Sequence, residues 1–108
     1  MTLEQLSTTL ESIEGFSGKV VYYAWPEGQA PALPFICYLE NGSNGFAADG
    51  ISFYASRRID IELYTRLRDM TSEGAVEAAL TEASIYWSKE INYIDSEKCY
   101  QITYEVEI

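Results

Sequence analysis

The side chains that could do chemistry in this sequence are carboxylates, thiols and arginines, because the chain contains no histidine. Histidine is the commonest general base and metal ligand, so its absence removes the usual centre of both kinds of site. Cys37 and Cys99 lie far apart and in no Cys-x-x-Cys pair, which is a poor supply for the four ligands of zinc. We therefore expect two reduced thiols, no metal and no cofactor.

The 17 acidic residues could in principle furnish the acid/base pair of a hydrolase. Four of them occupy alternate positions on segments that are predicted to be strands, where they would face solvent; these are Asp60, Glu62, Glu105 and Glu107. The sequence contains neither a glycine-rich phosphate-binding motif nor a Gly-x-Ser-x-Gly motif. We therefore expect a protein that is not an enzyme.

The balance of charge is strongly acidic, with 17 acidic and 7 basic residues and a formal net charge of -10. Nonspecific binding to nucleic acid depends on neutralising phosphates with lysine and arginine, so we expect no nucleic-acid partner. Anionic membranes should repel the chain, and no apolar run approaches the roughly 20 residues of a membrane helix. The first residues lack the features of a signal peptide, which predicts a cytoplasmic protein after translation. The length of 108 residues predicts a single domain over 1–108.

Most of the few basic residues lie close together in the sequence. Four of the 7 fall between positions 57 and 68, and they are Arg57, Arg58, Arg66 and Arg68. One interpretation is that they pair with glutamates on neighbouring strands. The other is that they form a basic edge that contacts the acidic face of another subunit, with Arg66 and Arg68 at the interface.

The elements that position these side chains centre on residues 51–65, which show the longest two-residue alternation in the chain. Successive side chains of a strand point to opposite faces, so this segment has one apolar and one polar face. We predict a central strand, because a long exposed edge invites aggregation. Arg57 interrupts the apolar face, which indicates a bulge or a strand end.

Two helices are predicted over residues 2–14 and 71–83, where apolar residues recur with a helical period. Thr2 and Gln5 have the spacing of a capping box. Candidate caps of the second helix are Asp69, Thr71 and Ser72.

Further strands are predicted over residues 20–25, 35–40 and 100–108, which are rich in β-branched and aromatic residues. Residues 85–94 fit either one irregular strand or two short pieces. The expected fold is α+β, with a mostly antiparallel or mixed sheet of four or five strands and both helices packed on one face.

Residues 41–50 are the most loop-like stretch, because their glycines and asparagines favour turns. Asn41-Gly42 and Asn44-Gly45 could each form a tight hairpin turn. Phe46 either folds back on the core or contacts a partner. If the loop is an interface, the candidate contact residues are Asn44, Phe46 and Asp49.

Six segments, taken in order along most of the chain, carry a further pattern. They are YYAWPEG (22–28), AP (30–31), LPFICY (33–38), NGSN (41–44), IELYT (61–65) and YQITYE (100–105). Together they resemble the small minor structural proteins of long-tailed phages and prophages. That group is similar to the tail-terminator proteins, which are also called tail-completion or head–tail joining proteins.

The resemblance implies an α+β subunit that joins a hexameric ring on assembly. Ordering the loop over 41–50 costs conformational entropy, which predicts that the free subunit is a monomer. Such a ring stops polymerisation of the tail tube and offers the surface for attachment of the head. The implied partners are other copies of the chain, the tail tube protein and the head–tail connector. The implied location is the head-proximal end of the virion tail, reached from the host cytoplasm.

A protein of another class also fits the acidic composition. It would be a small host-side binding or immunity-type module, whose acidity mimics nucleic acid and occupies a basic partner. Such a module would stay monomeric in the presence of purified tails, whereas a tail terminator would assemble on them.

Overall fold

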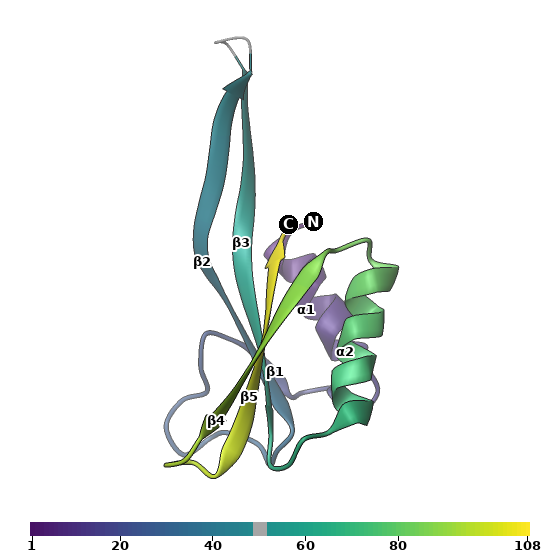
Figure 1. Cartoon of the computed structure of the whole chain (residues 1–108), viewed down its shortest axis with the longest axis vertical. Coiled ribbons are helices and arrows are strands. Elements are labelled where there is room, and N and C mark those ends of the chain that lie inside the picture. The colour runs from purple at the N-terminus through teal and green to yellow at the C-terminus, as the bar shows by residue number, and fades with distance from the viewer. Residues whose placement is uncertain (49–51) are drawn as a thin grey trace.

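The fold is a five-stranded sheet with two helices on one of its faces (Figure 1). The computed structural model describes the backbone of residues 1–48 and 52–108 and the side chains of residues 1–42 and 57–108. The elements are α1 (Leu3–Glu11), β1 (Val20–Tyr22), β2 (Phe35–Ala48), β3 (Ser52–Thr65), α2 (Met70–Glu82), β4 (Trp87–Ile94) and β5 (Cys99–Glu107). The strand order is β1-β2-β3-β5-β4, in which β1 is parallel to β2 and the other neighbours are antiparallel. The predicted α+β class is confirmed, and the sheet is mixed.

Strand β3 lies in the middle of the sheet, as its alternation predicts. Ile59, Ile61 and Leu63 have no exposed surface and form the centre of the core beneath the helices. Arg57, which breaks the apolar pattern, is half exposed and lies 3.8 Å from the carboxylate of Glu40. The prediction of cross-strand pairing is thus confirmed for this arginine.

Both helices begin with the caps that the sequence indicates. At α1 the Thr2 hydroxyl accepts the backbone N–H of Gln5 at 3.1 Å, and the Gln5 side chain accepts the backbone N–H of Thr2 at 2.9 Å. At α2 the Asp69 carboxylate accepts the backbone N–H of Ser72 at 3.0 Å. These bonds satisfy N–H groups that a helix start leaves unpaired. None of the helices in the described part of the chain is long and apolar enough to cross a membrane.

Three predicted element boundaries are wrong. Helix α1 ends at Glu11 and not at residue 14, and Ser12 is its C-cap. Strand β1 ends at Tyr22 and not at Trp25, because Tyr23 adopts a positive φ of 72° that a continuing strand does not allow. Residues 41–48 are not a loop, because β2 continues to Ala48 and pairs with β3 as far as Ser52. Pairing along the whole hairpin satisfies the backbone groups of this stretch, and that gain outweighs the turn preference of its glycines and asparagines.

The hairpin of β2 and β3 therefore projects beyond the rest of the sheet as an arm (Figure 1). The ladder between β3 and its other neighbour, β5, ends at Arg58, and Arg57 exchanges two further backbone hydrogen bonds with Ile108. Among the described residues, those of 44–56 therefore pair only with each other. A register shift between Glu40 and Gly42 marks the base of the arm. A Cβ on Gly42 would displace the flexible guanidinium of Arg58, and the φ of 153° is one that residues with a side chain rarely adopt, so this position favours glycine.

The predicted hairpin turns at Asn41-Gly42 and Asn44-Gly45 are wrong, because both pairs lie inside β2. Asp49 lies outside the described residues, and so do the side chains of Asn44 and Phe46. Whether Phe46 packs on the core or on a partner therefore stays a prediction.

The ambiguous segment 85–94 is resolved as one strand, β4, which forms an outer edge of the sheet. Cys37 and Cys99 are buried free thiols on β2 and β5, which β3 separates. The expectation of two unpaired cysteines agrees with this placement.

Ile61→Ala should lower the free energy of unfolding by about 2–5 kcal/mol, because it removes methyl groups from a fully buried site. The matched control is Ile91→Ala on edge strand β4, where the side chain is 46% exposed and the loss should stay below about 1 kcal/mol. Urea denaturation of both variants measures the difference. Equal losses would contradict the central position of β3.

Candidate functional site

The polar chemistry between the helices and the sheet is concentrated at Glu73, whose side chain is 2% exposed. Its carboxylate accepts two hydrogen bonds from Arg68, from Nε to Oε2 at 2.9 Å and from Nη2 to Oε1 at 3.1 Å. Lys89 on β4 donates a third bond to Oε1 at 3.0 Å. A buried carboxylate is tolerated only when it is paired in this way.

A second carboxylate extends the cluster along α2. Glu77 accepts a hydrogen bond from Lys89 Nζ at 2.8 Å and another from the Tyr104 hydroxyl at 2.7 Å. The lysine nitrogen also lies 5.9 Å from the centre of the Tyr104 ring. We call this set of residues, Arg68, Glu73, Glu77, Lys89 and Tyr104, the helix–sheet charge cluster. It contains two anions and two cations, so it attracts no further ion through net charge.

The pKa shifts of the cluster stabilise the ionised forms. The hydrogen bond from Arg68 lowers the pKa of the Glu73 carboxyl, and burial opposes this effect. The hydrogen bond with Glu77 raises the pKa of the Lys89 ammonium. Burial raises the pKa of the Tyr104 hydroxyl, which therefore remains protonated and donates to Glu77. A general acid or base at neutral pH needs a pKa near 7, and these shifts move the groups away from it.

Sequence reasoning missed this cluster, although a signal for it exists. Glu73 and Glu77 lie on one face of α2 with the buried Val76 and Leu80, because positions three and four residues apart share a helix face. A carboxylate in the apolar stripe of a helix predicts a buried ion pair.

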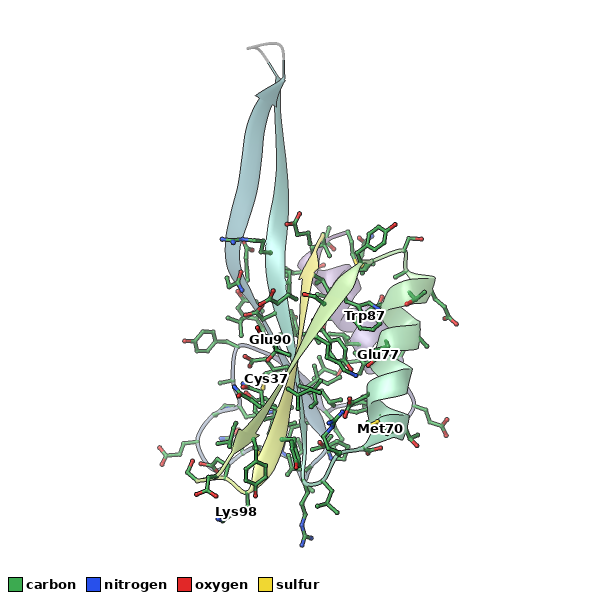
Figure 2. The ribbon with its side chains drawn as sticks, viewed as in Figure 1. Cys37, Met70, Glu77, Trp87, Glu90 and Lys98 are labelled. Carbon is green, nitrogen blue, oxygen red and sulfur yellow. The ribbon has the colours of Figure 1, made fainter. Side chains whose placement is uncertain are left out.

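The other face of the sheet carries most of the strand carboxylates. Figure 2 shows Glu90 and Cys37 on the side away from the helices, whereas Trp87 and Glu77 lie on the helix side. We call this side the outer face, and Asp60, Glu62, Glu90 and Glu105 share it. Among the described residues, no cation forms an ion pair with any of the four.

Cys37 on the outer face is not an activated nucleophile. Burial raises the pKa of its thiol to about 11, and the neighbouring Glu62 adds to the shift. A reactive cysteine needs the opposite shift, because the thiolate is the nucleophile. Burial likewise raises the pKa of the Glu62 carboxyl, which the Tyr64 hydroxyl contacts at 3.1 Å. In the described part of the chain, no group of three or more carboxylates and thiols could hold a metal ion.

The two predicted interface arginines have different surroundings. Arg68 belongs to the helix–sheet charge cluster, where it pairs with Glu73. Arg66 is exposed, and within the described residues it forms no ion pair. The exposed fraction of the adjacent Leu67 is 72%. The structure therefore does not bring Arg66 and Arg68 together in one site, and their role between subunits stays a prediction.

Comparisons with known proteins bear on the fold. No family model and no curated protein matches the sequence. The chain is similar to a chain of a solved structure titled "Virion of native gene transfer agent (GTA) particle", with a TM-score of 0.50 and 14% sequence identity. The alignment covers 94% of this chain and 82% of that chain. At this identity the similarity shows a shared fold over nearly the whole domain.

Glu73→Gln should lower the free energy of unfolding at pH 7 by about 2–3 kcal/mol, because it leaves Arg68 and Lys89 with too little negative charge. The folded-state pKa of Glu73 lies below its ordinary value of 4.5, so its contribution is present above pH 4.5 and is lost as the pH falls through the folded pKa. The variant should therefore lose less stability than the wild type as the pH falls below 4.5. Urea denaturation as a function of pH measures both effects.

Glu82→Gln at the exposed end of α2 is the matched control, with an expected change within about 0.5 kcal/mol. If Glu73→Gln unfolded with the same free energy and the same pH dependence as this control, the helix–sheet charge cluster would not stabilise the fold.

Proposed function

We propose that the protein is a non-enzymatic structural component of a phage-type particle, and that it caps the tail tube and joins the tail to the head. The observation that carries the proposal is the fold shared with a chain of a gene transfer agent virion over 94% of this chain. The resemblance of six ordered segments to tail-terminator proteins supports the finer assignment. In this role the protein acts as a hexameric ring at the head-proximal end of the tail.

The chemistry of the described residues agrees with a structural role. The most buried ionised group, Glu73, ties α2 to the sheet and is saturated by its partners. The raised pKa of Cys37 makes its thiol a poor nucleophile at neutral pH. We propose that the protein needs neither a metal nor a cofactor for its function.

The arm of β2 and β3 is the feature best suited to reach a neighbour. It makes the molecule 50 Å long but only 27 and 23 Å wide. Residues 43–56 pair with no other strand among the described residues, so their removal leaves the core contacts intact. We propose that the arm contacts the next subunit or the tail tube, and the predicted interface residues Asn44, Phe46 and Asp49 all fall within the segment that forms it.

Replacing residues 44–56 with Asn-Gly tests this role. Ser43 and Arg57 face each other in the register, so a two-residue turn can connect them. The shortened protein should melt within a few degrees of the wild type, because the core and the helix–sheet charge cluster are unchanged. It should fail to cap tail tubes, and electron microscopy should then show overlong tubes or tails without heads. Tails of normal length that carry heads would contradict a role for the arm.

A further inference from the structure

The surface contains a groove whose lining is both acidic and apolar. Its volume is about 550 Å³, and it lies beside the middle of β3, the start of β4 and the end of β5, near the base of the arm. The charged residues that line it are three acids and one base, namely Asp60, Glu105, Glu107 and Arg58. Tyr86, which is 96% exposed, contributes apolar surface. The groove therefore favours an occupant that carries a positive charge beside an apolar group.

One acceptor in this groove is unsatisfied. The Oδ1 atom of Asp60 is buried and has no hydrogen-bond partner. Asp60 also stands directly opposite Glu105 in the register, so two like charges face each other on the outer face. Because this oxygen is buried, a partner in the groove meets the two carboxylates through Glu105, which is exposed.

The chain itself contains a feature with the complementary chemistry. The connection between β3 and α2 carries Arg66 and Leu67 side by side. Leu67 is 72% exposed, and Arg66 is exposed without an ion pair among the described residues. We call these two residues the basic corner. Figure 1 places this corner at one end of the body, and the C-terminal end of β5, beside the groove, at the other.

We propose that the groove of one copy of the chain binds the basic corner of a second copy. The Arg66 guanidinium donates to the exposed carboxylate of Glu105, and Leu67 packs on Tyr86, which lines the groove and is 96% exposed. Because the corner and the groove are different surfaces, each copy can offer one to the preceding copy and the other to the following copy. Repetition of such a contact closes a ring when the rotation between copies closes.

This inference deepens the proposed assembly role, on which it rests for the choice of a second copy as occupant. The contact is also consistent with a net charge of -10 on every copy. The Debye length is about 8 Å at physiological salt, so long-range repulsion is screened and the local pairing of opposite charges decides. A contact of this size should be weak in free protein and should strengthen where several copies meet on a tail end.

A charge exchange tests the contact in the purified full-length protein. Amide chemical shifts of the wild type should change with concentration, from the micromolar to the millimolar range, at Arg66 and Leu67 and around Trp87. Arg66→Glu should weaken this self-association about tenfold or more, since it replaces an attraction with a repulsion. Adding Glu105→Lys to Arg66→Glu should restore it, because the opposite charges meet again with their positions exchanged.

Two controls have the same changes of net charge. Lys98→Glu, on the turn between β4 and β5, changes the charge as Arg66→Glu does and should leave self-association unchanged. The double variant Arg66→Glu with Glu27→Lys has the net charge of the rescued protein but no charge in the groove, and it should not be rescued. The proposal is overturned if the wild-type shifts at the corner and the groove are independent of concentration, or if the Glu27 double variant is rescued equally.

The same variants separate this contact from the tail role. If the exchange behaves as expected in solution while Arg66→Glu leaves tail length normal, the contact between copies stands and the tail-capping function fails. If Arg66→Glu gives overlong tails but the wild type shows no shifts in the groove, the tail role stands and this contact is wrong.

Discussion

Strand β3 runs past the end of its neighbour β5, and this difference in length determines much of the molecule. From Arg58 to Tyr64 the strand has a partner on each side, and its apolar residues lie under the helices. Beyond Arg57 it has only β2, and the two strands leave the sheet together as the arm. The groove lies where β5 stops, at the same boundary. One mismatch between strand lengths thus produces a packed body, a projecting arm and a hollow between them.

The buried charge of Glu73 is a second constraint, because the free energy of removing a carboxylate from water must be offset by cations close to α2. Arg68 precedes the helix, and Lys89 belongs to β4, the strand at the edge of the sheet. The carboxylate therefore fixes the helix start and the edge strand relative to each other. A buried ion pair adds little net stability compared with apolar packing, although breaking one is expensive. Its clearest contribution here is to position, because it ties the edge strand β4 to α2. Since Arg68 pairs with Glu73, Arg66 is the arginine of the connection that has no ion pair among the described residues.

Much of the fold could be predicted from the sequence, because local patterns coincide with the final packing. The alternation around Ile59, Ile61 and Leu63 identified the central strand, and Thr2 with Gln5 identified the start of α1. The extent of the hairpin could not be predicted in this way. Asn41 and Gly42 have strong turn preferences, but the pairing of β2 with a strand of equal length overrides them, and that pairing is a long-range property.

The candidate site was less predictable than the fold for a related reason. Hydrogen bonds within the charge cluster join residues that lie up to 31 positions apart in the sequence. Its key carboxylate, Glu73, cannot be told from any other acidic residue of a helix before the position of the helix on the sheet is known. The four arginines between positions 57 and 68 share a sequence neighbourhood but not an environment, since Arg57 pairs with Glu40 and Arg68 with Glu73. Proximity in sequence therefore did not define a basic surface.

The distribution of satisfied and unsatisfied charges explains why a strongly acidic chain could still associate with itself. The cations Arg68 and Lys89 form ion pairs with the buried carboxylate of Glu73. The remaining surface charge is therefore more uniformly acidic than the composition alone suggests. Any exposed arginine without an internal partner then becomes a specific feature of that surface. Arg66 is such a residue, and the acidic groove that Glu105 lines is the counterpart that we propose for it. A scarcity of free cations makes a contact between copies selective, because few alternative pairings compete with it.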